Sequence, residues 1–300
     1  VWSFHGPITT FDFCQVPPRT LGSFHNIFCW LCWIIALSSP STKGGNDRLS
    51  MGAFDARFPI TYRAPIIGKN SVDKTAVRDA ATIIVLRQDQ GETRVLMGQR
   101  GAKAAFMPNK FVFPGGAVDA DDANIPIHAG IDALCYERLS KQGDPKLIHP
   151  LCVAAIRELW EETGLILGTK GTWNDIIPED WVTYADRGYI PDASALKFVF
   201  RAITPPGRPR RFDARFFMID ANAIASNLDD FSAACDELSH LSWIPLDEVR
   251  KFDLPFITEV VLAEVKRHGD PSKAPATVPF YKNSEEENLF IQLHGHPPTD

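Results

Sequence analysis

In the segment RELWEETGL, residues 157–165, two glutamates follow the first glutamate after three and four residues, and the next-to-last residue is a glycine. Residues at these spacings share one face of a helix, so Glu158, Glu161 and Glu162 converge on one side of a helix expected over residues 151–163. Like charges at these spacings cost about 0.2–0.5 kcal/mol per pair, and the helix dipole disfavours anions near the C-terminal end. Because Gly164 marks that end, the pattern predicts carboxylates that serve something other than helix stability.

Three converging carboxylates suit a hard cation that prefers oxygen ligands, such as Mg²⁺ or Mn²⁺. The glutamates alone leave a second interpretation open, which is an ordinary acidic face exposed to solvent. The surrounding residues decide between the two.

Short strands and helices alternate from about residue 78. Apolar, β-branched runs predict strands, and glycines and prolines mark their ends. The expected strands are residues 81–87, 94–99, 111–113, 197–203, 211–219 and 241–245, and the expected helices are 151–163 and 255–268. Prolines limit any helix within residues 123–150, and the proline-rich tail from Asp270 is expected to be irregular. The alternation predicts an α/β fold.

A glycine-containing loop, FVFPGGAVDADD at residues 111–122, precedes the expected helix. Together the two segments resemble the signature of the Nudix hydrolase family, G-x5-E-x7-R-E-U-x-E-E-x-G-U, where U is aliphatic. Residues 157–165 match it at every defined position, and Gly116 and Asp122 match its first half with aspartate in place of glutamate. The spacer of 34 residues, 123–156, replaces the seven of the signature and so contains an insertion of 27.

The resemblance implies a Nudix α/β/α sandwich with a mixed β-sheet. It places one domain over residues 51–300, with its core at about 78–268. The implied activity is Mg²⁺- or Mn²⁺-dependent hydrolysis of a diphosphate linkage in a nucleoside diphosphate derivative. A Nudix-fold module that senses a metabolite without turnover is the alternative, but such modules usually lose signature glutamates that this chain keeps.

Site residues follow from the same resemblance. The implied metal ligands are the Gly116 carbonyl, Glu158, Glu161 and Glu162, and the implied catalytic residues are Arg157, Glu158 and Glu161. Arg157 is expected to orient a carboxylate by a bidentate contact, and Asp122 to take the supporting role of the replaced glutamate. The general base is left open, and Glu237 is a candidate for that role or for a distal metal ligand.

Residues 100–122 and 209–217 are similar to the coenzyme A diphosphatase-like branch, some of whose members carry an insertion inside the signature. This chain has Ala104, Ala105 and Asn109 where that branch usually has histidine and a further basic residue. Coenzyme A or acyl-CoA is therefore one expected substrate, with Arg100, Arg210 and Arg211 as substrate-binding residues. Dinucleotides of the ADP-ribose or NADH type are the other.

The amino-acid composition limits the kinds of partner that the protein is expected to bind. Lys and Arg number 31 against 37 Asp and Glu, a net charge of −6, which argues against a protein built to hold a nucleic-acid backbone. Six cysteines without regular spacing predict a reduced, cytoplasmic protein rather than a disulfide framework. We expect a small-molecule partner and no stable membrane insertion. The oligomeric state is left open, a homodimer included.

Residues 1–50 differ in composition from the remainder. Residues 1–42 hold only two charged side chains but three of the seven tryptophans, and the apolar run at 27–37 is eleven residues long. A bilayer span takes about 20 residues, so this run is too short to cross a membrane. The first methionine is Met51. We expect an upstream extension, with a start-site artefact as one explanation, and a membrane-associating leader and a genuine structural element as the alternatives.

Overall fold

The computed structural model describes residues 76–104, 107–174, 176–283 and 288–294, so the predictions for residues 1–50 lie outside the described residues. The strands of the main sheet are β1 (Val77–Asp89), β2 (Glu92–Arg100), β3 (Phe111–Val112), β4 (Gly115–Ala117), β7 (Lys197–Ile203), β8 (Arg211–Asp220), β9 (Leu238–Pro245), β10 (Val278–Asn283) and β11 (Asn288–Leu293). A small second sheet pairs β5 (Gly168–Lys170) with β6 (Tyr189–Pro191). The α-helices are α2 (Ala133–Ser140), α3 (Ile148–Thr163), α4 (Val182–Ala185) and α5 (Phe256–His268).

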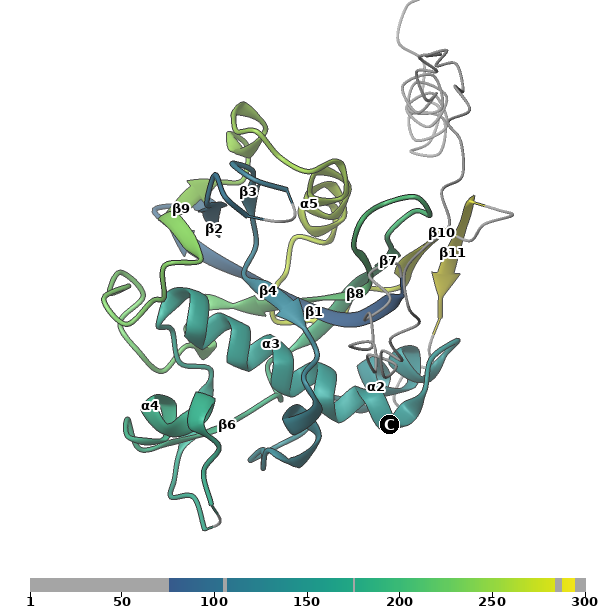
Figure 1. The fold of residues 1–300 in the computed structure, drawn as a ribbon. Coiled ribbons are helices and arrows are strands. Elements are labelled where there is room, and N and C mark those ends of the chain that lie inside the picture. Colours follow the sequence, from purple (N-terminus) through teal and green to yellow (C-terminus); the bar gives the residue numbers. More distant parts are fainter. Residues whose placement is uncertain (1–75, 105–106, 175, 284–287, 295–300) are drawn as a thin grey trace, which may run out of the picture. The chain divides into compact units, whose positions relative to one another are not determined.

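The main sheet is mixed. Its strands follow the order β11-β10-β7-β8-β1-β2-β3, with β4 paired to β1 and β9 paired to β2. β1 runs parallel to β8 but antiparallel to β2 and β4. Helix α3 covers one face of the sheet and α5 covers the other (Figure 1). The described chain is therefore an α/β/α sandwich with a mixed sheet, as expected.

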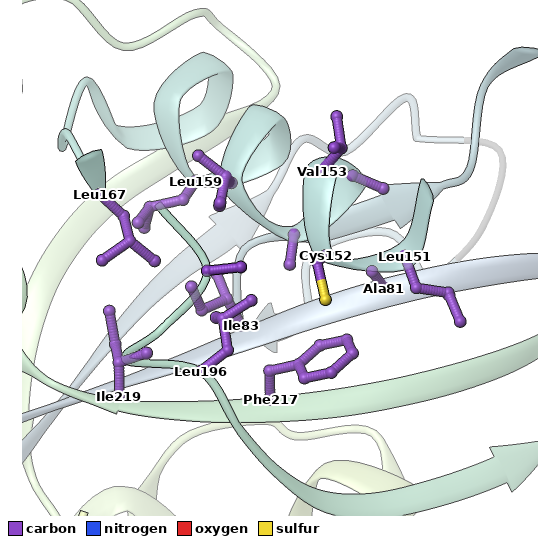
Figure 2. Packing of buried hydrophobic residues seen from close by; sticks show 14 of the residues in the cluster. Ala81, Ile83, Leu151, Cys152, Val153, Leu159, Leu167, Leu196, Phe217 and Ile219 are labelled. Atoms are coloured by element: carbon purple, nitrogen blue, oxygen red, sulfur yellow. The ribbon is translucent and has the colours of Figure 1, made fainter. Parts of the chain in front are cut away.

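Side chains of β1 alternate between the two faces of the sheet and so contribute to the core on both faces. Successive side chains of a strand point to opposite faces, so Ile83 packs on the α3 side and Ile84 on the α5 side, and neither is exposed. Figure 2 shows Leu151 and Cys152 of α3 pointing toward Phe217 of β8. Burial of α3 against the sheet fixes which of its faces is turned to the loop before β4.

Most predicted elements agree with the structure to within a few residues. Helix α3 begins at Ile148, three residues before the expected start, because Pro150 lies in the first turn, where its missing N–H is not needed. Helix α2 fits between Pro126 and Pro145. Among the described residues, none of the helices has the length and apolar character that a bilayer crossing requires.

The tail from Asp270 was wrongly expected to be irregular. Its residues form β10 and β11, which extend the main sheet beyond β7. Pro279 is tolerated because it lies outside the two positions, Phe280 and Tyr281, at which β10 pairs with β7. Val278 and Phe280 are buried in the core on the α3 side, so tertiary pairing decides the structure of a segment whose local composition favours none.

The insertion before α3 docks on the C-terminal strands. Arg138 of α2, which is buried, donates to the carbonyl oxygens of Pro275 (Nη1, 2.6 Å) and Ala276 (Nη2, 2.8 Å), just before β10. The Phe198 amide donates to Cys135 Sγ at 3.3 Å, and Lys197 Nζ lies 2.9 Å from Asp132 Oδ2. These contacts make the insertion part of the sheet's support.

We expect Arg138→Ala to lower the free energy of unfolding by about 3 kcal/mol. It removes two hydrogen bonds from a charged group, each worth about 1.5–3 kcal/mol, and leaves two carbonyls without that partner. Urea denaturation measures the change. Arg267→Ala, which removes an exposed pair with Glu264, is the control and should stay within about 0.5 kcal/mol. Equal effects from the two variants would refute the anchoring role of Arg138.

Candidate functional site

The loop at residues 114–118 is fixed over helix α3 by strand pairing. Gly116 pairs with Ala81 of β1, and the Ile83 amide donates to the Pro114 carbonyl at 2.9 Å. The Gly115 amide donates to Glu162 Oε2 at 2.8 Å. A Cβ on Gly116 would lie 2.2 Å from Glu158 Oε1, so only glycine allows this close approach.

A buried ion pair joins this loop region to α3 across the insertion. Arg157 Nε donates to Asp122 Oδ1 at 2.9 Å, and Nη2 donates to Asp122 Oδ2 at 3.1 Å. Nη2 also donates to the Ala117 carbonyl at 3.0 Å, and Nη1 donates to Glu158 Oε1 at 3.0 Å and to Glu161 Oε2 at 3.3 Å. The bidentate partner of Arg157 is therefore Asp122, while each contacted glutamate receives a single hydrogen bond.

Two of the three helix glutamates are buried. Glu162 is 1% exposed and Glu158 is 9% exposed, whereas Glu161 is partly exposed. The interpretation of an ordinary solvated acidic face is therefore wrong for Glu158 and Glu162. Only Glu161 faces solvent in the way that interpretation requires.

Burial controls the protonation of these carboxyls. It raises the pKa of Glu158 to about 7, with Arg157 opposing the rise and the charges of Glu161 and Glu237 adding to it. Burial, followed by repulsion from Glu158, raises the pKa of Glu162 well above its ordinary value, and the Gly115 amide opposes this. Burial also raises the pKa of Glu161 against the attraction of Arg157. In the absence of a cation, these carboxyls therefore hold protons more tightly than exposed glutamates do.

The donor set fits a divalent cation in type. Glu162 Oε1 is buried and has no hydrogen-bond partner, which is costly unless another group uses the oxygen. Carboxylate oxygens are the ligands that Mg²⁺ and Mn²⁺ prefer. Within the described ranges, no three histidine, cysteine, aspartate or glutamate side chains stand together as a complete cation site. The buried pair supplies suitable oxygens, and a further ligand would have to approach them.

Arg100 and Glu237 lie beside the buried pair. Arg100 Nη2 is 2.5 Å from Glu237 Oε1, and Arg100 pairs with Leu238 across β2 and β9. The charges of both residues act on Glu162, Arg100 lowering its pKa and Glu237 raising it, although burial remains the main cause of the shift. The structure therefore brings together residues from β2, the segment before β9 and α3.

Arg210 and Arg211 lie elsewhere along the sheet. Arg211 pairs with Val77, four residues along β1 from Ala81, and its Nε donates to the Thr204 carbonyl at 3.1 Å. Arg210 is exposed in the turn before β8. Arg201 of β7 does not join them as an exposed arginine, because its buried guanidinium is held by Asp213 at 2.9 and 2.7 Å.

Sequence reasoning assigned no role to two further acids near Glu161. Asp119 Oδ2 lies 3.6 Å from Arg157 Nη2, and the charges of Asp119 and Asp180 both help raise the pKa of Glu161, after burial. Asp119 stands within the quoted loop, so its position was a usable signal. Asp180 follows α3 by a long segment and carries no such signal.

Comparisons with known proteins give a partial match to a curated relative. No family model matches the chain. Over 179 residues, which are 56% of this chain, it is 31% identical to a Caenorhabditis elegans protein named as nudix hydrolase 7. The chain spans about half (51%) of that relative's length.

Solved structures of similar proteins were also found. A NUDIX hydrolase from Alicyclobacillus acidocaldarius is 26% identical with a TM-score of 0.49, and the match covers 63% of this chain and 90% of that one. A C. elegans Ap4A hydrolase is 18% identical with a TM-score of 0.35, and the match covers 64% of this chain and 96% of that one.

We expect the metal-free protein to lose stability as pH rises from about 4.5 to 7. The folded pKa of Glu158 is about 7 and that of Glu162 is also raised, so the folded state binds more protons than the unfolded state in this window. Glu162→Gln keeps an acceptor for the Gly115 amide and removes the buried charge. It should raise the free energy of unfolding at pH 8 in EDTA by about 1 kcal/mol or more, with a smaller difference at pH 4.5.

Urea denaturation at the two pH values measures this effect. Glu179→Gln, at an exposed position, is the matched charge control and should change stability little at either pH. A Glu162→Gln protein that is less stable than the parent at pH 8 would contradict the electrostatic account.

Proposed function

We propose that the chain is a Nudix hydrolase and that it hydrolyses a diphosphate linkage in a nucleoside diphosphate derivative with a divalent metal ion, because it carries the signature residues and resembles a curated relative. The observation that carries this proposal is the buried pair Glu158 and Glu162. Its unpartnered oxygen and raised pKa values are costly in a structural helix and useful for holding a cation.

Glu158, Glu161 and Glu162, with the Gly116 carbonyl, would hold the ion. When bound, Mg²⁺ or Mn²⁺ supplies charge neutralisation for the phosphoryl oxygens and lowers the pKa of a coordinated water. Arg157 keeps Glu158 in place through Nη1, and Asp122 in turn keeps Arg157 in place through two hydrogen bonds. Arg157 therefore positions a ligand.

Proton transfer requires a carboxylate that can exchange with solvent. The partly exposed Glu161 and the exposed Glu237 meet this requirement, whereas Glu162 is closed to solvent. Either of the two could accept the proton of an attacking water, so we propose Glu161 and Glu237 as candidates for the base that the sequence leaves open.

Within this class we propose a coenzyme A-type substrate, split to 3′,5′-ADP and a phosphopantetheine. The similarity of residues 100–122 and 209–217 to that branch supports it, and the exposed turn with Arg210 and Arg211 offers charge for a 3′-phosphate.

A screen of the purified protein with Mg²⁺ and with Mn²⁺ tests the activity. Coenzyme A, acyl-CoA, ADP-ribose, NADH and dinucleoside polyphosphates are the substrates to compare. Binding of one of these with no turnover under either metal would favour the sensing module over the enzyme.

Glu161→Gln should reduce turnover by at least 10-fold, about 1.4 kcal/mol of transition-state stabilisation. The substitution keeps the side chain's shape and removes one charge from the proposed ligand set. Steady-state kinetics in saturating Mg²⁺ measure it, and Glu179→Gln is the control for a nonspecific charge effect. Turnover near that of the parent protein would remove Glu161 from the site.

Coenzyme A should exceed dephospho-coenzyme A in kcat/KM, and Arg210→Ala or Arg211→Ala should reduce that difference. The two substrates differ only in the 3′-phosphate, so their ratio isolates its recognition. Much faster cleavage of ADP-ribose or NADH would refute the coenzyme A assignment and leave the metal chemistry in place.

A further inference from the structure

Arg100 and Glu237 form an ion pair at the edge of the site made by Glu158 and Glu162. Along β2, Leu96 packs on the α3 side, so Arg100, four residues on, points to the same face. Its Nη2 contacts Glu237 Oε1 at 2.5 Å, while its Nε is buried and has no hydrogen-bond partner. The guanidinium therefore has a buried donor that no group uses.

The backbone on both sides of this pair is constrained. After Arg100 the chain turns through Met107 (φ 50°) and Asn109 (φ 62°), and hydrogen bonds join the Arg100 amide to Lys110 and the Asn109 amide to Arg100. After Glu237 the chain passes through His240 (φ 53°), next to the irregularity in the pairing of β2 and β9. Left-handed backbone and bulges are concentrated at functional sites, where they direct a side chain.

Magnitudes argue against a purely structural ion pair. The Arg100 and Glu237 side chains are 19% and 52% exposed, and pairs with such access to water contribute about 0–1 kcal/mol. A bulky residue such as Met107 in the left-handed region costs about 1–2 kcal/mol by itself. The ion pair therefore stabilises the fold by less than the left-handed backbone near it destabilises the fold.

We propose that Arg100 and Glu237 are an exchangeable pair: a substrate diphosphate takes the Arg100 guanidinium, and the released Glu237 turns to the cation held by Glu158 and Glu162. This inference rests on the proposed function. Arginine suits the phosphate because its planar fork donates several hydrogen bonds to phosphate oxygens. Glu237 suits the cation because carboxylate oxygens are the ligands that Mg²⁺ and Mn²⁺ prefer and because its segment lies against α3, where the Cys235 amide donates to the Glu161 carbonyl at 2.7 Å.

Exchange would make cation and diphosphate binding depend on each other. With the pair closed, each partner neutralises the other beside the site. With the pair open, positive charge faces the phosphate and a further carboxylate faces the cation. Glu237 would then add a further carboxylate to the proposed ligands of the cation.

Binding measurements test this without relying on turnover. The probes are Mn²⁺, followed by its EPR signal, and methylenediphosphonate, followed by calorimetry, and the variants are Arg100→Ala and Glu237→Gln in the full chain. Arg100→Ala should weaken diphosphonate binding at saturating Mn²⁺ by at least 10-fold and tighten Mn²⁺ binding in the absence of diphosphonate by about 3-fold. Glu237→Gln should weaken Mn²⁺ binding and tighten metal-free diphosphonate binding, because its competition for Arg100 is removed.

The pair Arg87–Asp229 is the matched control. Its Nη1–Oδ1 distance is 2.6 Å, its side chains are 25% and 62% exposed, and it also joins a strand of the sheet to the segment before β9. Arg87→Ala and Asp229→Asn should leave both affinities within 2-fold. Melting temperatures of all four variants report any loss of folding.

The outcomes separate this inference from the proposed function. The exchange would be overturned if Arg100→Ala left the affinity for diphosphonate unchanged, or if Glu237→Gln left the affinity for diphosphonate in the absence of metal unchanged. In either case, Mn²⁺ binding by the parent protein would still support the proposed function. Equal losses of affinity for both ligands in both variants would show that the ion pair is structural, and this result would also overturn the exchange. A parent protein that binds neither probe would overturn both.

Discussion

The buried contact between Arg157 and Asp122 is the interaction on which the site depends. It joins helix α3 to the loop after β4 with hydrogen bonds of 2.9 and 3.1 Å, and both side chains are almost completely buried. Removing one member of such a pair leaves an unpaired buried charge, which typically costs about 3–5 kcal/mol. Because Arg157 also contacts Glu158 and Glu161, the same guanidinium that joins the two segments positions the carboxylates.

The surrounding fold makes this costly arrangement possible. Pairing of Gly116 with Ala81 fixes the loop, and the apolar contacts of α3 with the sheet fix the helix, so Glu158 and Glu162 are held away from water. Burial then raises the pKa of Glu158 and Glu162 and leaves one oxygen unpartnered. Stability comes from the core on both faces of the sheet, and part of it is lost where the carboxylates meet.

The insertion and the C-terminal strands form a second level of support. Arg138 of α2 is bonded to the segment that leads into β10, and β10 pairs in parallel with β7. Asp122 and Arg157 are 35 positions apart in the chain, yet the insertion between them leaves and rejoins the fold so that the two side chains meet. An insertion that packs on the sheet need not disturb a signature whose halves it separates.

The sequence by itself predicted most strands of the central sheet, the two longest helices and the candidate residues of the site, since these depend on local patterns: β-branched runs, glycine and proline ends, and glutamates at helical spacing. It did not determine that the tail after Asp270 forms two strands, that Arg201 is held by Asp213, or that two of the three glutamates are buried. Only the tertiary structure decided these, because strand pairing, burial and ion pairing join residues far apart in the chain. Arg100 and Glu237 show the difference most clearly: each looks ordinary in its own segment, and their meeting beside Glu162 follows from the pairing of β2 with β9.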